Sequence, residues 1–336
     1  CQAQLSLSPN QTASTLVNTL VATSGTSGVT VSNVQLNCDT SANGLFSGIS
    51  NLGISNGIVL GSGSIQSDPL NFTYGLDGVA LDVSSTALGT SGDNDLTTII
   101  SAPTYDACIL EFDLQPVGNF VEFEYIFGSE EYPEYNCTAF NDVFAFLISG
   151  PGITGTDNMA IVPGSTIPVS INSINDGTGG CSTNQSLYVT NTGSTVTLDG
   201  FTTPLIATHT VTPGSTYHLK MALADVSDAI FNSYVVLKAN SLKSGSTNPS
   251  GVSGLQADAD LQVYPSIVNE ELHFRQVNAQ LLSIAVRDLQ GKVFIQTQRN
   301  EKSFVLDTSS LPQGVYLVNT QNLSTGKRSS LRIVKQ

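Results

Sequence analysis

The stretch ACILEFDLQPVGNFVEFEYIF (residues 107–127) determines the fold that we expect for this chain. Apolar residues alternate with carboxylates through both of its halves, a period of two that is typical of strands with one buried face. We therefore predict strands over 107–114 and 119–127, joined as a hairpin by the turn sequence QPVG. The apolar faces carry Leu110, Phe112, Leu114, Phe123, Tyr125 and Phe127, and the opposite faces carry Glu111, Asp113, Glu122 and Glu124.

The same alternation recurs along most of the chain. Further strands are expected over 57–65, 141–150, 159–164, 167–174, 203–211, 216–225 and 233–240. Helical spacing is confined to 10–22, where Ser14 is available as a cap, and 93–101. These patterns predict an all-β chain, a jelly-roll-like β-sandwich followed by a small Ig-like β-sandwich. No apolar run approaches the roughly 18 residues that a membrane helix requires.

Charge is sparse and unevenly distributed. Charged residues make up 12% of the 336 residues, and the net charge of -15 argues against nucleic acid as a partner. Residues 1–257 contain three Lys against 20 Asp and Glu, a net −17, whereas 258–336 contain nine bases against seven acids, a net +2. Because this change coincides with the Ser/Gly/Pro-rich stretch 241–257, we predict domains at 1–240 and 258–336 joined by a linker.

The three bases of the first domain are Lys220, Lys238 and Lys243. Like charges on adjacent strands are unfavourable, so Glu122 and Glu124 should have a positive neighbour. We predict that Lys220 and Lys238 lie in the same sheet as these glutamates and pair with them. The alternative is that all four charges are simply solvated. With the pairs formed, these two lysines are not available to the loop carboxylates of the domain.

Four cysteines, Cys38, Cys108, Cys137 and Cys181, lie in the first domain, and none has a CxxC or zinc-type spacing. In an extracellular β-protein we expect two disulfides, for which three connectivities exist. We pair Cys137 with Cys181 because both lie in long polar loops, and Cys38 with Cys108 by elimination. Cys1 is expected to be either the acylated cysteine of a lipoprotein or a residue near a signal-peptidase cut.

Two acidic segments suggest a metal site. FGSEEYPEYNCTAFNDVFAF (127–146) mixes carboxylates with aromatic residues, which we assign to the core, and ADVSDAIFNSY (224–234) follows a predicted strand. Because no base is available and Asp, Glu and Asn oxygens suit calcium better than zinc or copper, we predict a calcium site where strand ends converge. The candidate ligands are Glu130, Glu131, Asp142, Asp225, Asp228 and Asn232. Asp93 and Asp95 form a third acidic group.

Two other interpretations of these carboxylates remain open. They could be exposed and hydrogen-bonded to Ser, Thr and backbone N–H groups, or the calcium could bridge a sugar or protein ligand. Catalysis has little support, because His209 and His218 lie on predicted strands and His273 lies in the other domain. Paired carboxylates also serve glycosidases, but the chain has no Trp to line a sugar cleft. We therefore expect no enzymatic activity.

Four segments together resemble the choice-of-anchor L domain, a β-rich extracellular module of bacterial surface proteins. They are LVNTLVATSGTSGVTVSNVQLNC, YDACILEFDL, FEYIFGSEEYPEYNCTAFNDVFAFLISG and LKMALADVSDAIFNSYVVLKA, within residues 12–240. The most specific parts, SEEY…FNDVFAF and ADVSDAIF, contain the two acidic groups described above. The resemblance implies a surface protein but no particular ligand.

The end of the chain resembles a type IX secretion sorting domain of type A. The resemblance is carried by VYPSIVNEELHF (263–274), VRDLQGKVF (286–294), FVLDTSSLPQGVYLVNT (304–320) and GKRSSLRIVKQ (326–336). It implies a small β-sandwich, recognised by the type IX machinery of Bacteroidota and usually removed when the mature protein is joined to a surface polysaccharide. The implied motif residues are Tyr264, Pro265, Gly291, Gly314 and Tyr316; Ser266 stands where the family usually has Asn.

Together these patterns predict a secreted protein on the outer cell surface of a Gram-negative, Bacteroidota-type bacterium. We expect it to act as a non-enzymatic adhesion or binding module for a surface polysaccharide or protein ligand that the sequence does not identify. The alternative is a structural subunit that self-assembles into an extracellular filament or sheath, which low charge and abundant Thr, Ser and Asn would suit.

Overall fold

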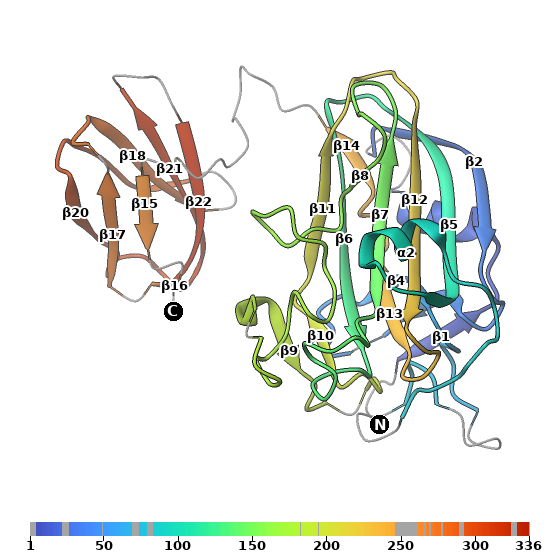
Figure 1. Ribbon diagram of the computed structural model, residues 1–336. Helices are drawn as coiled ribbons and strands as arrows, with labels where there is room; N and C mark the ends of the chain where they lie inside the picture. Colours follow the sequence, from blue (N-terminus) through green and yellow to red (C-terminus); the bar gives the residue numbers. More distant parts are fainter. Residues whose placement is uncertain are drawn as a thin grey trace. The chain divides into compact units, whose positions relative to one another are not determined.

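The computed structural model divides into two compact units, residues 1–246 and 247–336, which are described separately. It describes residues 5–21, 27–48, 50–68, 74–78, 83–181, 183–193, 195–245, 261–264, 267–268, 270–276, 278–288, 292–323 and 328–335. Nearly all of the regular structure is β-strand, which confirms the predicted all-β class (Figure 1). None of the helices in these residues is both long and apolar enough to span a membrane.

Two antiparallel sheets form the first unit. The larger sheet has the order β1-β3-β4-β13-β6-β10-β9, and β11 and β14 also pair with β6. Its strands are β1 (Ser6–Pro9), β3 (Asn43–Ser47), β4 (Asn56–Gly61), β6 (Phe120–Ser129), β9 (Tyr188–Thr190), β10 (Gly200–Thr202), β11 (Leu205–Thr210), β13 (Ser233–Lys238) and β14 (Lys243–Gly245). The smaller sheet, in the order β2-β5-β12-β7-β8, contains β2 (Val29–Asn37), β5 (Thr104–Pro116), β7 (Val143–Ser149), β8 (Asp157–Asn158) and β12 (Tyr217–Val226).

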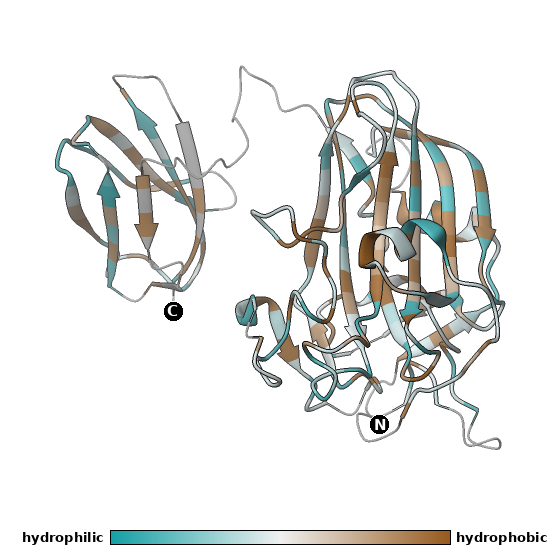
Figure 2. Cartoon of the chain, in the orientation of Figure 1, coloured by the Kyte–Doolittle hydropathy of each residue, from teal (hydrophilic) through white to brown (hydrophobic). Residues whose placement is uncertain are grey.

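The main core of this unit lies between the two sheets. Buried side chains of β5, β7 and β12 belong to one hydrophobic cluster with those of β4, β6 and β13. At its centre the ring of Phe146 stands 4.9 Å from both Phe123 and Tyr125, edge to face. Hydrophobic and hydrophilic residues alternate along parts of strands such as β5 and β6 (Figure 2), as the period of two predicts. β4, β7 and β13 are instead buried at nearly every position, because further hydrophobic clusters cover the faces turned away from the main core.

The predicted hairpin over 107–127 is wrong, although both of its strands exist. β5 and β6 lie in different sheets, and residues 117–119 carry the chain from one sheet to the other. β5 pairs with β2 and β12, whereas β6 pairs with β13 and the shorter strands around it. The two apolar faces therefore meet across the core, and the carboxylates of each strand face away from it. A hairpin would have placed four carboxylates side by side on one sheet, which is unfavourable.

Both predicted helices are present. α1 (Ala13–Leu20) buries Leu16, Val17 and Leu20 in the core. Its cap is Thr12, whose hydroxyl accepts the Thr15 N–H at 3.2 Å, so the predicted cap Ser14 is wrong and lies inside the helix. α2 (Asn94–Ile100) begins at the cap Asp93 and covers the outer face of the smaller sheet, where Leu96 is fully buried. A short 3-10 helix, η1 (Gln185–Leu187), precedes β9.

Both predicted disulfides are confirmed. Cys38, which follows β2, is bonded to Cys108 in β5, and Cys137 is bonded to Cys181 between two loops. The bonds close chain segments with sequence separations of 70 and 44 residues.

Other assignments from the sequence differ in detail. β14 pairs with β6, so residues 241–245, which were predicted to begin the linker, belong to the first unit. The strands predicted over 159–164 and 167–174 are replaced by turns with single bridges, such as the one between Ile161 and Pro168. Proline cannot donate to a strand ladder, which explains why this proline-containing segment does not form a continuous strand.

The second unit contains two sheets around one core of its own. One sheet contains β15 (Leu261–Tyr264), β17 (Glu271–Gln276) and β20 (Ser303–Asp307). The other contains β16 (Ile267–Val268), β18 (Leu282–Asp288), β19 (Val293–Arg299), β21 (Gly314–Asn322) and β22 (Arg328–Lys335). Among the predicted motif residues, Tyr264 ends β15, Gly314 begins β21, and Tyr316 is buried with its hydroxyl donating to the Pro312 carbonyl at 2.8 Å. Pro265 and Gly291 lie outside the described residues.

Candidate functional site

The candidate site lies at the end of the first sandwich where strands of both sheets begin and end. β6 ends opposite the start of β13, and β12 ends beside the start of β7. The connection 227–232 therefore crosses between the sheets at this end, where β10 and β9 continue the larger sheet (Figure 1). The two acidic segments found in the sequence are brought together here. Glu130 and Glu131 follow β6, Asp142 precedes β7, Asp225 is near the end of β12, and Asp228 and Asn232 lie in the connection.

Four of these carboxylates are almost completely buried. Glu130, Glu131, Asp142 and Asp225 are 3%, 1%, 1% and 1% exposed. Asp142 accepts the Val226 N–H at 2.9 Å through Oδ1 and the Ser233 hydroxyl at 2.7 Å through Oδ2. Neither oxygen of Asp225 has a partner at hydrogen-bond geometry among the described residues, although the Ser62 hydroxyl and the Asp142 carboxyl lie beside it. Buried carboxylates of this kind require a compensating charge or a proton.

Burial raises the pKa of each carboxyl in this group for which a change is resolved. It raises the pKa of Asp142 to about 7, although the Ser233 and Val226 hydrogen bonds act in the opposite direction. Burial, reinforced by the charges of Asp142 and Asp228, raises the pKa of Glu131 to about 9. Burial and the neighbouring Asp142 raise the pKa of Asp225 well above its ordinary value. Any cation that binds here must therefore displace protons.

Asn232 and Asp228, two of the predicted ligands, have structural hydrogen bonds. The Asn232 amide donates to the Ser84 hydroxyl at 2.9 Å and accepts the Thr86 N–H at 3.2 Å. Asp228 accepts the Ile230 N–H at 3.2 Å and stabilises the turn. In the described part of the chain, no three His, Cys, Asp or Glu side chains are positioned to hold a metal ion together. A metal at this end would therefore need neutral oxygen donors as well.

The lysines of the larger sheet are paired on its outer face. Lys238 Nζ lies 2.7 Å from Glu124, which confirms that predicted pair. Glu122 pairs instead with Lys243, at 3.0 Å, because β14 lies beside β6.

The predicted position of Lys220 is wrong. Its strand, β12, belongs to the smaller sheet, and Lys220 Nζ lies 2.6 Å from Asp93 and 2.7 Å from Asp95. α2 and its cap cover this face of the sheet and bring the two aspartates to the lysine. The third acidic group of the sequence therefore surrounds a lysine.

Three half-buried aromatic rings, which we call the aromatic face, lie on the loops of the carboxylate group. Tyr135 stands 5.4 Å from Phe140 and 5.5 Å from Phe231, and the adjacent Ile230 is 48% exposed. From the sequence, every aromatic residue of 127–146 is expected in the core. That is correct for Phe127, Tyr132, Phe144 and Phe146, and wrong for Tyr135 and Phe140. The sequence signal that could have indicated their partial exposure is that Tyr135 and Phe140 lie outside the alternating pattern of the strands.

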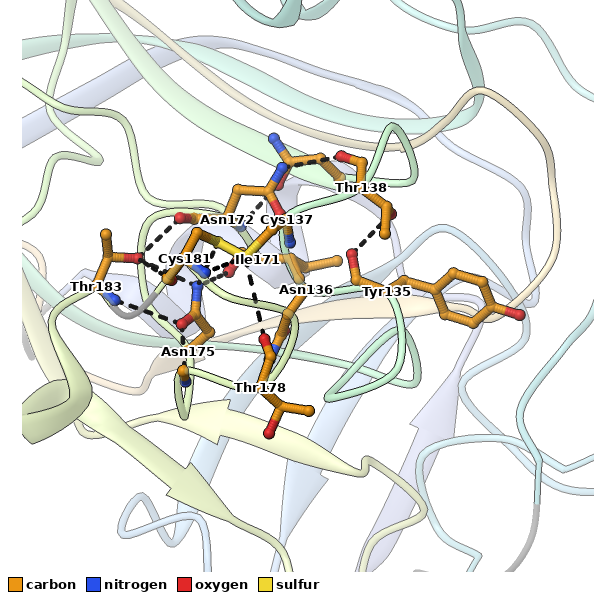
Figure 3. Close-up of a disulfide and its surroundings, with 12 residues drawn as sticks. Tyr135, Asn136, Cys137, Thr138, Ile171, Asn172, Asn175, Thr178, Cys181 and Thr183 are labelled. Atoms are coloured by element: carbon orange, nitrogen blue, oxygen red, sulfur yellow. Dashed lines mark hydrogen bonds between the residues drawn. A yellow bond between two sulfur atoms is a disulfide. The ribbon is translucent and has the colours of Figure 1, made fainter.

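A disulfide and side-chain hydrogen bonds hold the loop of Tyr135 (Figure 3). Cys137 is bonded to Cys181, and Asn172 accepts the Cys137 N–H at 2.5 Å. The Asn172 amide also donates to the Thr138 carbonyl at 3.0 Å, and the Thr138 hydroxyl donates to the Tyr135 carbonyl at 2.7 Å. This loop is therefore fixed by contacts independent of any ligand, a favourable arrangement for binding.

Comparison with family models gives two matches. The choice-of-anchor L domain matches residues 6–243, and the secretion system C-terminal sorting domain matches residues 262–336. Both resemblances seen in the sequence are thus confirmed. No curated protein matches the chain.

Solved structures resemble the chain only distantly. PorZ, an essential bacterial surface component of the type-IX secretion system of Porphyromonas gingivalis, is 16% identical with a TM-score of 0.20, over 34% of this chain and 14% of that chain. A β-glucuronidase from Ruminococcus gnavus, solved with uronic isofagomine, is 8% identical with a TM-score of 0.26, over 68% of this chain and 35% of that chain. The chain thus spans only a minor part of either protein.

Proposed function

This chain belongs to the choice-of-anchor L family, and from that premise we propose that it is a non-enzymatic adhesion or binding module. Its sorting domain directs it through the type IX secretion machinery to the cell surface or extracellular space of Bacteroidota. The proposal concerns what the first unit does there.

The aromatic face is the observation that carries the proposal. Tyr135, Phe140 and Phe231 come from two separate loops, yet their rings contact one another and remain partly accessible. Aromatic residues provide a large contact area with few rotatable bonds, which lowers the entropic cost of binding. The Cys137–Cys181 disulfide anchors the first of these loops. A fixed, partly exposed aromatic group on loops is typical of a recognition surface.

The environment of two histidines also favours a non-enzymatic role. His209 Nε2 lies 3.1 Å from Asp157, and His218 Nδ1 lies 2.9 Å from Asp113. The histidines lie on β11 and β12 and their partners on β8 and β5, whereas the aromatic face lies on loops. The hydrogen bonds of these histidines in the described structure go to carboxylates and a backbone carbonyl, and none goes to a Ser or Cys side chain that the imidazole could activate as its base.

Calcium stabilisation is part of the same proposal. Glu130 and Glu131 lie in the loop 130–141 with two rings of the aromatic face, whereas Asp142 directly follows this loop and Asp225 lies in β12 just before the connection 227–232. A bound cation would neutralise the carboxylates and hold both loops, either as a structural ion or as a bridge to a sugar or protein ligand. Chelation should then lower the unfolding temperature of the full chain, and added calcium should restore it by mass action.

Binding of the labelled full chain to a glycan array and to a panel of immobilised surface proteins tests the proposal. We expect saturable binding that is lost in a Tyr135→Ser/Phe231→Ser double variant. Ile206→Ser is the matched control, since Ile206 is 59% exposed on β11 and outside the aromatic face. An absence of binding, or equal binding by the double variant, would overturn the proposal.

Native mass measurement and negative-stain microscopy of the same preparation test the alternative function. A stable monomer supports the binding module. Filaments that form without added ligand would instead favour a structural subunit of a filament or sheath.

A further inference from the structure

Asp225 lacks the hydrogen bonds that a comparable buried carboxylate of the same unit receives. Asp106 is also 1% exposed, and it accepts the Leu88 N–H together with the N–H and the hydroxyl of Thr90. Within the described residues, neither oxygen of Asp225 has a partner at regular hydrogen-bond geometry, although the Ser62 hydroxyl and the Asp142 carboxyl lie beside it. An ionised carboxylate in this position is strongly unfavourable unless a positive charge lies against it.

The Asp225 carboxyl lies among polar side chains at the ends of neighbouring strands. Asp142 lies two residues before the core residue Phe144 of β7, and the Asp225 carboxyl lies beside that of Asp142. Ser62 and Ser233 stand at corresponding positions, two residues after Leu60 of β4 and two before Val235 of β13. The Ser233 hydroxyl donates to Asp142, and the Ser233 N–H donates to the Ser62 hydroxyl at 2.9 Å. Two carboxylates and two hydroxyls, one from the end of each of four strands, thus close this end of the core.

No base of the first unit can balance these carboxylates. The unit contains three lysines and no arginine, and Lys220, Lys238 and Lys243 are each in an ion pair with another carboxylate. When the two carboxyls are ionised, the compensating charge must therefore come from solution or from another molecule. The side chains of the described residues that lie beside the two carboxyls, those of Ser62 and Ser233, offer hydroxyl oxygens. Oxygen atoms are the ligands of calcium and magnesium and not those of zinc or copper.

We infer that a divalent cation of the calcium class binds between Asp142 and Asp225, with the Ser62 and Ser233 hydroxyls and backbone or water oxygens as its other donors. Two carboxylates neutralise one such ion, so three acidic ligands are not needed. This site is smaller than the six-residue set predicted from the sequence, since Asp228 and Asn232 stabilise neighbouring turns. The ion would link the ends of β7, β12 and β13, from which the loops of the aromatic face extend. Only this last consequence, an effect on ligand binding, rests on the proposed function.

Isothermal titration of calcium into the metal-free full chain tests the inference. We expect one saturable site per chain, loss of the saturable heat in Asp225→Asn, and an unchanged site in Asp157→Asn, an aspartate whose side chain is 56% exposed. An absence of calcium binding to the wild type at millimolar concentration would overturn the inference. Binding to Asp225→Asn with the affinity of the wild type would do so as well.

A second variant keeps the test valid if Asp225→Asn does not fold, as judged by circular dichroism. Ser62→Ala retains both carboxylates and removes one neutral donor, so it should fold and weaken calcium binding roughly 10-fold or more. Wild-type affinity in a folded Ser62→Ala would remove that hydroxyl from the site and contradict the inference. A chain that binds calcium at Asp225 but no glycan or protein would refute the proposed function alone, so the two failures are distinguishable.

Discussion

Without a divalent cation, the first unit should lose stability as the pH rises from 5 to 8. Burial raises the pKa of Asp142 from an ordinary value of 3.8 to about 7. Between these values the native state keeps a proton that the unfolded chain has released. Because the unfolded state then binds fewer protons, the free energy of unfolding falls with rising pH. The contribution is fully present below the unfolded pKa and is lost as the pH passes the folded pKa.

The size of the effect follows from the difference between these two values. At about 1.4 kcal/mol per pH unit, it amounts to about 4 kcal/mol, of which about 3 kcal/mol is lost between pH 5 and pH 8. Burial also raises the pKa of Asp225 and Glu131, so both act in the same direction. In a domain of this size, about 3 kcal/mol corresponds to a change in melting temperature of roughly 6–12 °C.

Urea unfolding in the presence of a chelator, followed by tyrosine fluorescence, measures this effect. Eight of the ten tyrosines lie in the first unit, so the signal reports mainly on its unfolding. Calcium should stabilise the chain more at pH 8 than at pH 5, since it competes with protons for the carboxylates. Asp225→Asn should show a shallower pH dependence, and the control Ile206→Ser, which changes no titratable group, should keep the wild-type slope. A free energy of unfolding that does not change with pH in chelator would refute the reasoning.

Three further predictions concern stability. Replacing Cys137 and Cys181 together by Ser should lower the free energy of unfolding by about 4 kcal/mol on a chain-entropy model for a 44-residue separation, and an unchanged urea midpoint would contradict it. Glu124→Gln should lower the free energy of unfolding by less than about 1 kcal/mol, because the ion pair with Lys238 is partly exposed. A larger decrease, measured by urea unfolding, would show that solvent does not screen this pair. Phe146→Ala should lower the free energy of unfolding by about 3–5 kcal/mol, since the ring is buried against two aromatic rings. An unfolding temperature close to that of the wild type would contradict this and show that the core collapses around the cavity.

The strand positions of the first unit could be predicted because most of the strands carry an alternating apolar face that is turned to the core. The period of two placed β5, β6, β7, β11, β12 and β13 within a few residues of their observed bounds. The same reasoning placed the two acidic segments at strand ends, where they do meet. The pairing of Cys137 with Cys181 also followed, because two polar loops that are not constrained by a sheet can approach each other.

The partners of these strands could not be predicted from alternation alone. An alternating strand fits equally well beside its neighbour in sequence or across the core from it, and β5 and β6 adopt the second arrangement. The error for Lys220 has the same origin, because assigning β12 to the wrong sheet gave its lysine the wrong carboxylates. Side chains in irregular loops follow no period, so the partly exposed Tyr135 and Phe140 were not distinguished from the buried aromatic residues around them.

The shortage of basic residues and the buried carboxylates are two aspects of one electrostatic problem. A buried carboxylate is usually balanced by a base of its own chain or by several hydrogen bonds. Both solutions occur within this unit: Lys220 balances a carboxylate as an ion-pair partner, and Asp106 accepts several hydrogen bonds. At the loop end neither solution is available to Asp225 in the described structure. Its neutralisation must then depend on the surrounding solution, through a proton at low pH or a cation at higher pH. The stability of the loop end, and with it the geometry of the aromatic face, should therefore follow the ionic conditions outside the cell.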